Sequence, residues 1–335
     1  MFAKKYCRLL VATCLLVLVF LIVSGSSYSA GEDQSEKLSS IKLTIASRGA
    51  TDYFLGDLAD IAEKISEGRI TFDRYPGGAL GDQAEVLAQT LIGTINMCIA
   101  STEVSQIEEK LLVFELPFII KDSDHAKRIF SGEIGEQLAE LMTPHGIRIL
   151  GFGENGYRHI TNNVRPIYIP EDVKGLKLRI PGGKVRAAIF ETLKADTASI
   201  PGSEVFSAIT QGVVDGQENP FSVIDYNKIY EVNKYLSLTG HVYSPFYALI
   251  NEKKWQELDK ETQTILRAAA VEAGLKTFER NTSDNNKLLE KFKEQGVEVN
   301  EVDYDAFVEA VQPVYEMFAD TIGLDLIQAI RDEAN

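Results

Sequence analysis

The strongest constraint on the fold is the order in which strand-like and helix-like patterns follow one another in the first third of the chain. Short apolar or alternating runs, typical of strands, are separated by segments whose apolar residues recur at helical spacing. The strand-like runs are 41–47, 70–75 and 95–100, and the helix-like segments are 53–66 and 82–91. Strands joined by helical crossovers lie parallel to one another. The sequence therefore predicts an α/β protein with a parallel sheet.

A later strand pattern carries a basic side chain to the position where α/β sheets bind ligands. Residues 176–180 alternate leucine or isoleucine with lysine or arginine, and Pro181 ends the run. Arg179 therefore sits at the carboxyl end of a strand, where open α/β sheets form ligand crevices. Asn219 follows another short apolar run and also precedes a proline. We expect both side chains to converge on one small anion, because a guanidinium matches a carboxylate. From the spacing alone, the alternative that Arg179 is an ordinary surface residue stays open.

Two further side chains are candidates for the same crevice. Glu103 follows the strand 95–100 at its carboxyl end and could accept hydrogen bonds from ligand hydroxyls or an ammonium group. The alternative is a solvated acid at the start of a helix, where the macrodipole favours it. Tyr243 belongs to an aromatic cluster of the kind that usually forms core packing. We select Tyr243 as the cluster member that walls the ligand pocket.

The motif Gly151-x-Gly153-x-x-Gly156 matches the glycine fingerprint of dinucleotide-binding proteins and follows a predicted strand. That fingerprint requires a helix next, whose N-terminus holds the pyrophosphate. The following residues are β-prone and turn-like, so the sequence argues against a dinucleotide site. We expect the glycines to permit a bend where the strand passes between two domains. Arg158 then lies just past a hinge, near the cleft.

The chain is long enough for two domains, with 335 residues. It is expected to cross between them near Phe152 and again near Ser244, which is the layout of a hinged, cleft-closing protein. Residues 259–295 predict one helix of roughly 55 Å, long enough to brace both domains. The expected domains are 41–155 plus about 245–282 (domain I) and 156–244 plus about 283–335 (domain II).

Several motifs in a fixed order resemble one family. They are 76–81 (PGGALG), 114–118 (FELPF), 156–162 (GYRHITN), 175–179 (GLKLR), 214–220 (VDGQENP) and 239–241 (TGH). Together they look like the solute-binding proteins of TRAP transporters, the DctP family, from about Ile41 to the C-terminus. The resemblance implies a two-domain periplasmic binding protein with a ligand cleft, in which Arg179 pairs with the ligand carboxylate and Arg158 and Asn219 are supporting donors. It implies TRAP membrane subunits as partners and coupling to an ion gradient rather than ATP.

The resemblance also bears on the ligand. The motifs 156–162 and 239–241 are similar to the subgroup that binds sugar acids such as uronates or aldonates, which is the favoured class. Aromatic or branched 2-oxo acids and C4-dicarboxylates remain alternatives. This chain has Gly182 and Gly183 where many relatives carry a polar residue, and Gly202 where many carry a phenylalanine. We expect a pocket that is roomier on the side of the second domain.

The N-terminus predicts secretion. Residues 1–30 combine basic residues with 15 almost wholly apolar ones at 9–23, fewer than the ~20 that a spanning helix needs. We expect a signal peptide cleaved between about 26 and 30, a disordered lead-in at 31–40 and a periplasmic mature protein. An uncleaved anchor is the alternative. Only Cys98 remains after cleavage, so no internal disulfide is expected.

Charge and missing motifs limit the function classes. The net charge is −15, and the first 30 residues carry no acid, so the remainder is still more acidic. Such a surface argues against nucleic-acid binding. No nucleophilic elbow, phosphate-binding loop or spaced metal ligands occur, so no cofactor is expected and a secreted enzyme is the alternative class. A ligand-sensing subunit of a receptor would use the same binding chemistry. The protein is expected to be mostly monomeric.

Overall fold

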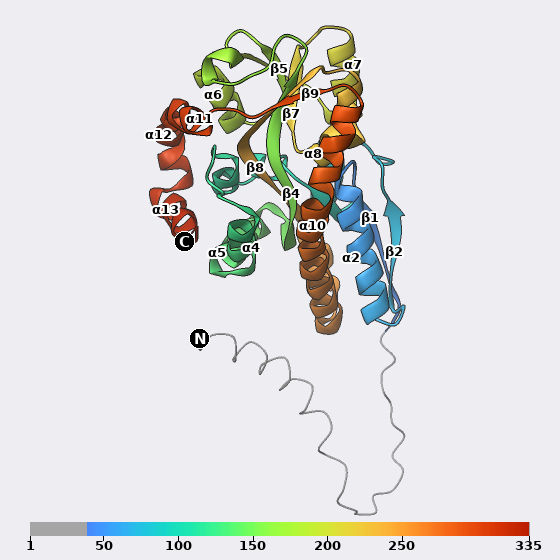
Figure 1. Ribbon diagram of the computed structural model, residues 1–335. Coiled ribbons are helices and arrows are strands. Elements are labelled where there is room, and N and C mark those ends of the chain that lie inside the picture. The colour runs from blue at the N-terminus through green and yellow to red at the C-terminus, as the bar shows by residue number, and fades with distance from the viewer. Residues whose placement is uncertain (1–38, 335) are drawn as a thin grey trace, which may run out of the picture. The chain divides into compact units, whose positions relative to one another are not determined.

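The computed structural model describes residues 39–334 (Figure 1). The predicted signal peptide and most of the lead-in lie outside these residues. The strands are β1 (Ile41–Ala46), β2 (Ile70–Tyr75), β3 (Met97–Ala100), β4 (Ile147–Asn162), β5 (Lys177–Ile180), β6 (Asp196–Ser199), β7 (Gly216–Asn219), β8 (Tyr235–Asn251) and β9 (Glu298–Asn300). The helices are α2 (Thr51–Ile65), α3 (Gln83–Leu91), α4 (Ser123–Ser131), α5 (Glu133–Glu140), α6 (Lys184–Thr192), α7 (Val205–Thr210), α8 (Phe221–Tyr226), α9 (Glu252–Glu257), α10 (Lys260–Glu294), α11 (Tyr304–Ala310), α12 (Gln312–Ile322) and α13 (Leu324–Asp332). Short 3₁₀ turns include η3 (Glu109–Glu115) and η6 (Gly202–Glu204).

One mixed sheet organises the described residues. Its strands follow the order β2-β1-β3-β8-β4-β7-β5-β6, and β9 pairs with β8. In the first half of the sheet, β1 is parallel to β2 and β3, which confirms the parallel pairing expected there. In the second half, β5 is parallel to β6 and β7. The α/β fold class predicted from the strand and helix order is confirmed.

Two long antiparallel strands join the halves. β4 has 16 residues and β8 has 17, and the two pair along most of their length. Glycines and polar residues interrupt the apolar pattern of both strands. The pairing of β4 with β8 continues past these residues with register shifts, two of which lie next to Gly151 and Gly156. β4 and β8 therefore each run without a break through both halves of the sheet.

The predicted long helix is present as α10, with 35 residues. At about 1.5 Å per residue it extends ~52 Å. It packs on α2 beside the first half, on β4, and on α8 beside the second half (Figure 1). A single helix thus braces both halves of the sheet, as expected.

Glycines in β4 and α10 let these two elements approach closely. A Cβ on Gly274 would lie 2.0 Å from the carbonyl oxygen of Phe152, and a Cβ on Gly153 would lie 2.9 Å from the Phe54 ring. These distances are shorter than any side chain tolerates. β4 continues through the glycines with register shifts beside Gly151 and Gly156, and Gly151 and Gly153 also allow the close packing of α10 and α2.

The core is apolar on both faces of the sheet, as buried parallel strands require. Cys98 of β3 is fully buried within it, and burial raises the pKa of its thiol to about 12. The thiol therefore behaves as the small core residue that its apolar neighbours predicted. Within residues 39–334, none of the helices is both long enough and apolar enough to cross a membrane.

The packing of α10 on β4 gives a matched pair of helical glycines. Gly274→Ala should lower the free energy of unfolding by about 1–3 kcal/mol, because the new methyl group overpacks the contact with Phe152. Gly56→Ala in α2 meets nothing within 4 Å and should raise stability by about 0.4–1 kcal/mol. Urea denaturation of both variants measures the difference. Equal effects of the two substitutions would contradict this role for Gly274.

Candidate functional site

The carboxyl ends of four strands meet at one polar cavity. β1 and β3 bring residues from the first half of the sheet, and β5 and β7 bring residues from the second half. Arg179, Arg158, Asn219 and Glu103 all line this cavity. The structure therefore brings together four of the five side chains predicted from the sequence. Ligand crevices form at such strand ends because loops and helix starts present polar groups there.

Arg179 is the cation that no acid in the cavity neutralises directly. It ends β5, is only 4% exposed, and donates from Nε to the carbonyl of Ile200 at 2.7 Å. Its two terminal nitrogens have no acceptor among residues 39–334. Burial, reinforced by nearby Arg158, lowers the pKa of Arg179 to about 10. The side chain thus stays charged at neutral pH and keeps a planar pair of donors available.

Arg158 lines the same cavity, but an internal partner compensates its charge. Its Nε and Nη2 atoms donate to the carboxylate of Glu218 at 2.5 and 2.9 Å, and Nη2 also donates to Asn219 Oδ1 at 2.8 Å. Arg158 is 2% exposed and Glu218 is fully buried. Asn219 in turn donates to Gln217. Arg158 and Asn219 are thus fixed in the cavity wall by each other.

A second buried arginine completes this network. Arg186 on α6 donates from Nη1 to both oxygens of Glu218 at 3.0 Å and from Nη2 to Glu115. Burial alone would raise the pKa of Glu218, but Arg158 and Arg186 hold it well below its ordinary value. Burial lowers the pKa of neighbouring His241, which therefore stays neutral. Two arginines and two carboxylates balance, and Arg179 remains as the uncompensated charge.

The sequence reasoning missed Arg186, Glu218 and Glu115, although a signal was present. Arg186 lies three and four residues before Ile189 and Phe190, on the buried face of α6. A charged residue on the apolar face of a helix is rarely buried without a charged partner. That position alone would have predicted a buried ion pair, though not with which acid.

Glu103 presents an oxygen without a partner. It follows β3, and its Oε2 atom is buried with no hydrogen bond to the described residues. Burial raises the pKa of Glu103, and the charge of Arg179 partly opposes this shift. Asn155 Oδ1 and Gln83 Oε1 are likewise buried and unpartnered, and both residues line the cavity. Buried polar atoms normally find partners, so three free acceptors in one cavity point to a ligand with several O–H groups.

Tyr243 is not brought to this cavity. It is 1% exposed within the core, where its ring packs against Tyr157 at 5.3 Å between centroids. The long strand β8 alternates its side chains across the sheet, and this register turns Tyr243 toward α4. The cluster follows the ordinary behaviour of aromatic side chains and forms packing.

The cavity is closed by contacts between the two halves of the sheet. Asp82, which caps α3, accepts hydrogen bonds from the backbone N–H and the hydroxyl of Ser203 at 3.3 and 3.0 Å. Ser203 therefore bonds across the cavity, and no side chain caps the helix α7 that follows it. Burial alone would raise the pKa of Asp82, yet Gln83, Arg48 and Ser203 together lower it.

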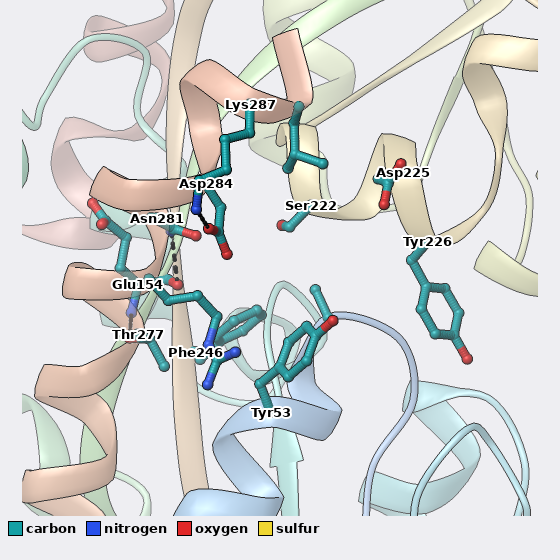
Figure 2. Close-up of a pocket in the computed structure, with 13 residues that line it drawn as sticks. Tyr53, Glu154, Ser222, Asp225, Tyr226, Phe246, Thr277, Asn281, Asp284 and Lys287 are labelled. Carbon is teal, nitrogen blue, oxygen red and sulfur yellow. Dashed lines mark hydrogen bonds and ion pairs between the residues drawn. The ribbon is translucent and has the colours of Figure 1, made fainter. Parts of the chain in front are cut away.

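A wider cavity lies on the other side of α8, between α2, α8 and α10 (Figure 2). Its volume is about 250 Å³, against about 50 Å³ for the arginine-lined cavity. Its cations have acidic partners: Arg280 contacts Asp57 at 3.3 Å and Lys287 contacts Asp284 at 2.9 Å. The larger volume would favour this second cavity, which also holds the unpartnered hydroxyl of Ser222, but the smaller one combines a guanidinium without an acidic partner with three unpartnered acceptors. Binding chemistry therefore selects the smaller cavity.

The described residues offer no metal site. Between residues 39 and 334, no group of three or more histidine, cysteine or acidic side chains is placed to hold a metal ion. The acids of the arginine-lined cavity are engaged by arginines or stand apart, as described above. The arrangement is suited to binding an organic anion through guanidinium and hydroxyl-accepting groups.

Comparison with known proteins identifies close relatives of this architecture. Residues 50–321 match the sequence profile of the family described as bacterial extracellular solute-binding protein, family 7 (DctP). The chain is 32% identical over 276 residues to the 2,3-diketo-L-gulonate-binding periplasmic protein YiaO of Escherichia coli K12. That alignment spans 81% of this chain and 84% of the relative.

Solved structures give the same result. A TRAP periplasmic solute-binding protein from Polaromonas sp. JS666, bound to D-erythronate, is 32% identical with a TM-score of 0.84, covering 87% of this chain and 98% of that one. A sugar acid-binding protein from Advenella mimigardefordensis, in complex with galactonate, is 28% identical with a TM-score of 0.84, covering 88% and 98%. These similarities confirm the two-domain binding-protein fold expected from the sequence.

The paired charges around Glu218 make a prediction for stability. Glu218→Gln leaves Arg158 and Arg186 with one carboxylate between them, so the free energy of unfolding should fall by about 3–5 kcal/mol. Glu257→Gln, which removes an exposed pair with Lys254, should change it by less than about 0.5 kcal/mol. Urea denaturation at pH 7 measures both.

The difference in unfolding free energy between the wild type and Glu218→Gln should depend on pH. The folded pKa of Glu218 is depressed, so its stabilisation is present above the unfolded value of about 4.3 and is lost as the pH falls through the folded pKa. The wild type should therefore lose its advantage over Glu218→Gln in acid. A constant difference between pH 7 and pH 3 would argue against an ionised Glu218.

Proposed function

Because the chain belongs to the bacterial extracellular solute-binding proteins of family 7, the DctP family, we propose that it binds a polyhydroxylated monocarboxylate. Members of this family are substrate-binding subunits of TRAP transporters and not enzymes. The chain is accordingly a binding protein that captures an organic acid and serves a membrane transporter. The identity of the acid and the roles of the residues below are our proposal.

One observation carries the proposal: a single uncompensated guanidinium faces three unpartnered acceptor oxygens in one buried cavity. Arg179 supplies the charge for one carboxylate. Glu103, Asn155 and Gln83 supply acceptors for ligand hydroxyl groups. A sugar acid carries both kinds of group on one small molecule. A branched or aromatic 2-oxo acid, and a C4-dicarboxylate, would satisfy Arg179 but leave most of these acceptors unpaired, at an energetic cost.

The relatives support the same class. The relative from E. coli is named for 2,3-diketo-L-gulonate, and the two structures hold D-erythronate and galactonate. Each is a hydroxylated or oxidised sugar acid with one carboxylate. We therefore favour aldonates and uronates for this chain.

In the proposed complex, Arg179 donates two parallel hydrogen bonds to the ligand carboxylate. Arg158 and Asn219 form the wall behind it, and Glu218 prevents Arg158 from competing as a second anchor. Because Glu218 and Glu115 neutralise Arg158 and Arg186, Arg179 is the one guanidinium left to pair with a carboxylate, which favours ligands with a single carboxylate. Charge-assisted bonds of this kind strengthen when water is excluded.

We also propose that the two halves act as hinged domains, with the boundaries 41–155 plus about 245–282 and 156–244 plus about 283–335. The contact of Asp82 with Ser203 joins the halves across the ligand cavity, so separation of the two residues would admit the ligand. The bracing helix α10 and the paired strands β4 and β8 are the elements that must flex.

The relatives are periplasmic proteins, and we place the mature protein in the periplasm after removal of a signal peptide. We further propose that it acts as a monomer. The net charge of −15 argues against nucleic acid as a partner.

Arg179 is the first residue to test. Arg179→Ala should weaken binding of D-galactonate by about 2–5 kcal/mol, a factor of about 30 or more in Kd, because the carboxylate loses the guanidinium that has no acidic partner. Arg179→Lys should retain part of the affinity, since an ammonium supplies charge without the planar pair of donors. Isothermal titration calorimetry measures both. Undiminished binding by Arg179→Ala would show that the anchor lies elsewhere.

Glu103 tests the hydroxyl-accepting side of the cavity. Glu103→Gln should weaken D-galactonate binding about tenfold, because a neutral amide accepts more weakly than a carboxylate. The unfolding free energy of the ligand-free protein should not fall, because an amide is less costly to bury than a charge. Titration and urea denaturation of the same preparation separate the two effects. A loss of stability without a loss of affinity would contradict the assigned role.

A further inference from the structure

Arg48 fills the space beside Gly202 and, like Arg179, lines the ligand cavity. It follows β1 in the first half of the sheet, whereas Gly202 lies in η6 of the second half. A Cβ placed on Gly202 would be 3.0 Å from Arg48 Nη1. Both residues line the cavity. The volume that the missing side chain of Gly202 leaves is therefore occupied by a guanidinium from across the cleft.

Asp82 and Tyr226 hold Arg48 in this position. The Nε atom lies 3.5 Å from Asp82 Oδ1, and the guanidinium carbon lies 5.9 Å from the centre of the Tyr226 ring. Tyr226 also separates this cavity from the wider cavity, where it is seen opposite α10 (Figure 2). The Arg48 side chain is 14% exposed. It is therefore positioned before a ligand enters.

The donors of Arg48 remain largely free. Asp82 already accepts from Gln83 at 2.9 Å and from Ser203 at 3.0 Å. Its 3.5 Å separation from Arg48 balances charge without a short hydrogen bond. Within residues 39–334, the guanidinium of Arg48 makes no hydrogen bond. An oriented set of donors thus faces the cavity.

The two free guanidinium groups differ in charge balance. Arg179 has no acid within ion-pair distance among the described residues, whereas Arg48 has Asp82. A ligand carboxylate is consequently drawn to Arg179. Arg48, whose charge Asp82 balances, suits a neutral ligand oxygen such as that of a hydroxyl group.

We propose that Arg48 is a specificity-determining residue that donates a hydrogen bond to the terminal hydroxyl group of a sugar acid whose carboxylate is bound by Arg179. By filling the space over Gly202, it also limits the length of the ligand. This inference deepens the proposed function and rests on it. The preferred ligands are sugar acids with a terminal hydroxyl group, in preference to their terminally deoxygenated analogues.

Pairs of acids that differ by this one hydroxyl provide the test. D-galactonate and D-fuconate form one pair, and L-mannonate and L-rhamnonate form another. The wild type should bind the hydroxylated member of a pair about tenfold more tightly, as expected for a hydrogen bond from a charged donor. Arg48→Ala should abolish that preference while weakening the deoxygenated member by less than about threefold. Calorimetry on all four acids measures the ratios.

A second variant reaches the same site without removing the arginine. Gly202→Phe places a ring where the Arg48 guanidinium lies, and Gly202 has no left-handed backbone angle that would make this substitution strained. It should also abolish the preference, and the double variant should add no further loss. Arg74→Ala removes an arginine paired with Asp60 and Glu63 and serves as the control with an unchanged ratio.

The outcomes separate the two levels of the proposal. A ratio that persists in Arg48→Ala, or an equal loss for both members of a pair, overturns the role of Arg48 while Arg179-dependent binding leaves the proposed function standing. Absence of binding to all four acids by the wild type overturns the sugar-acid class and the role of Arg48 together. The role of Arg48 is supported if both Arg48→Ala and Gly202→Phe lose the preference for the hydroxylated acid and at least one of them keeps the wild-type melting temperature.

Discussion

Four arginines line or back one buried cavity, and this is tolerable only because Asp82 balances Arg48 while Arg158 and Arg186 share two carboxylates. Glu218 receives hydrogen bonds from Arg158 and Arg186, and Glu115 receives one from Arg186. A buried charge without a partner is costly, so this network sets which arginine can serve a ligand. Arg179 is the one left over. Because Arg179 has no acidic partner and the neighbouring arginines do, the cavity is a site for one negative charge.

The architecture explains how residues so distant in the sequence meet. One half of the sheet contains the parallel strands β1 and β3, and the other half contains the parallel strands β5 and β7. Residues at or after the carboxyl ends of these strands line the cavity from both halves. Close packing of α10 on β4 depends on glycines that carry no side chain at the contact. The same helix packs beside both halves and runs past a cleft whose walls make polar contacts such as that of Asp82 with Ser203. Such contacts can separate with little loss of apolar packing.

Much of the site followed from strand-end positions. Arg179 and Asn219 could be placed because a proline ends each strand, and Glu103 because it follows a buried strand. The environment of each side chain could not be predicted, since it depends on pairing between distant segments. Arg158 was expected as a donor, yet the register of β4 against β7 sets it beside Glu218. Tyr243 faces the core because of the alternation along β8, and nothing local distinguishes it from its aromatic neighbours.

The glycine at 202 shows a further limit of sequence reasoning. A missing side chain suggested a roomier pocket, but the space is filled from the other half of the sheet by Arg48, about 150 residues earlier in the chain. Only the folded arrangement relates these positions. The glycine fingerprint at Gly151 to Gly156 is a comparable case, because its meaning depends on the helix that packs against it.

A crystal structure of the protein bound to D-galactonate tests the central claim most directly. We expect the two carboxylate oxygens to lie about 2.7–2.9 Å from the terminal nitrogens of Arg179. Arg158 should remain paired with Glu218. A carboxylate bound instead by Arg158, with Glu218 displaced, would contradict the assignment of Arg179 as the single uncompensated charge.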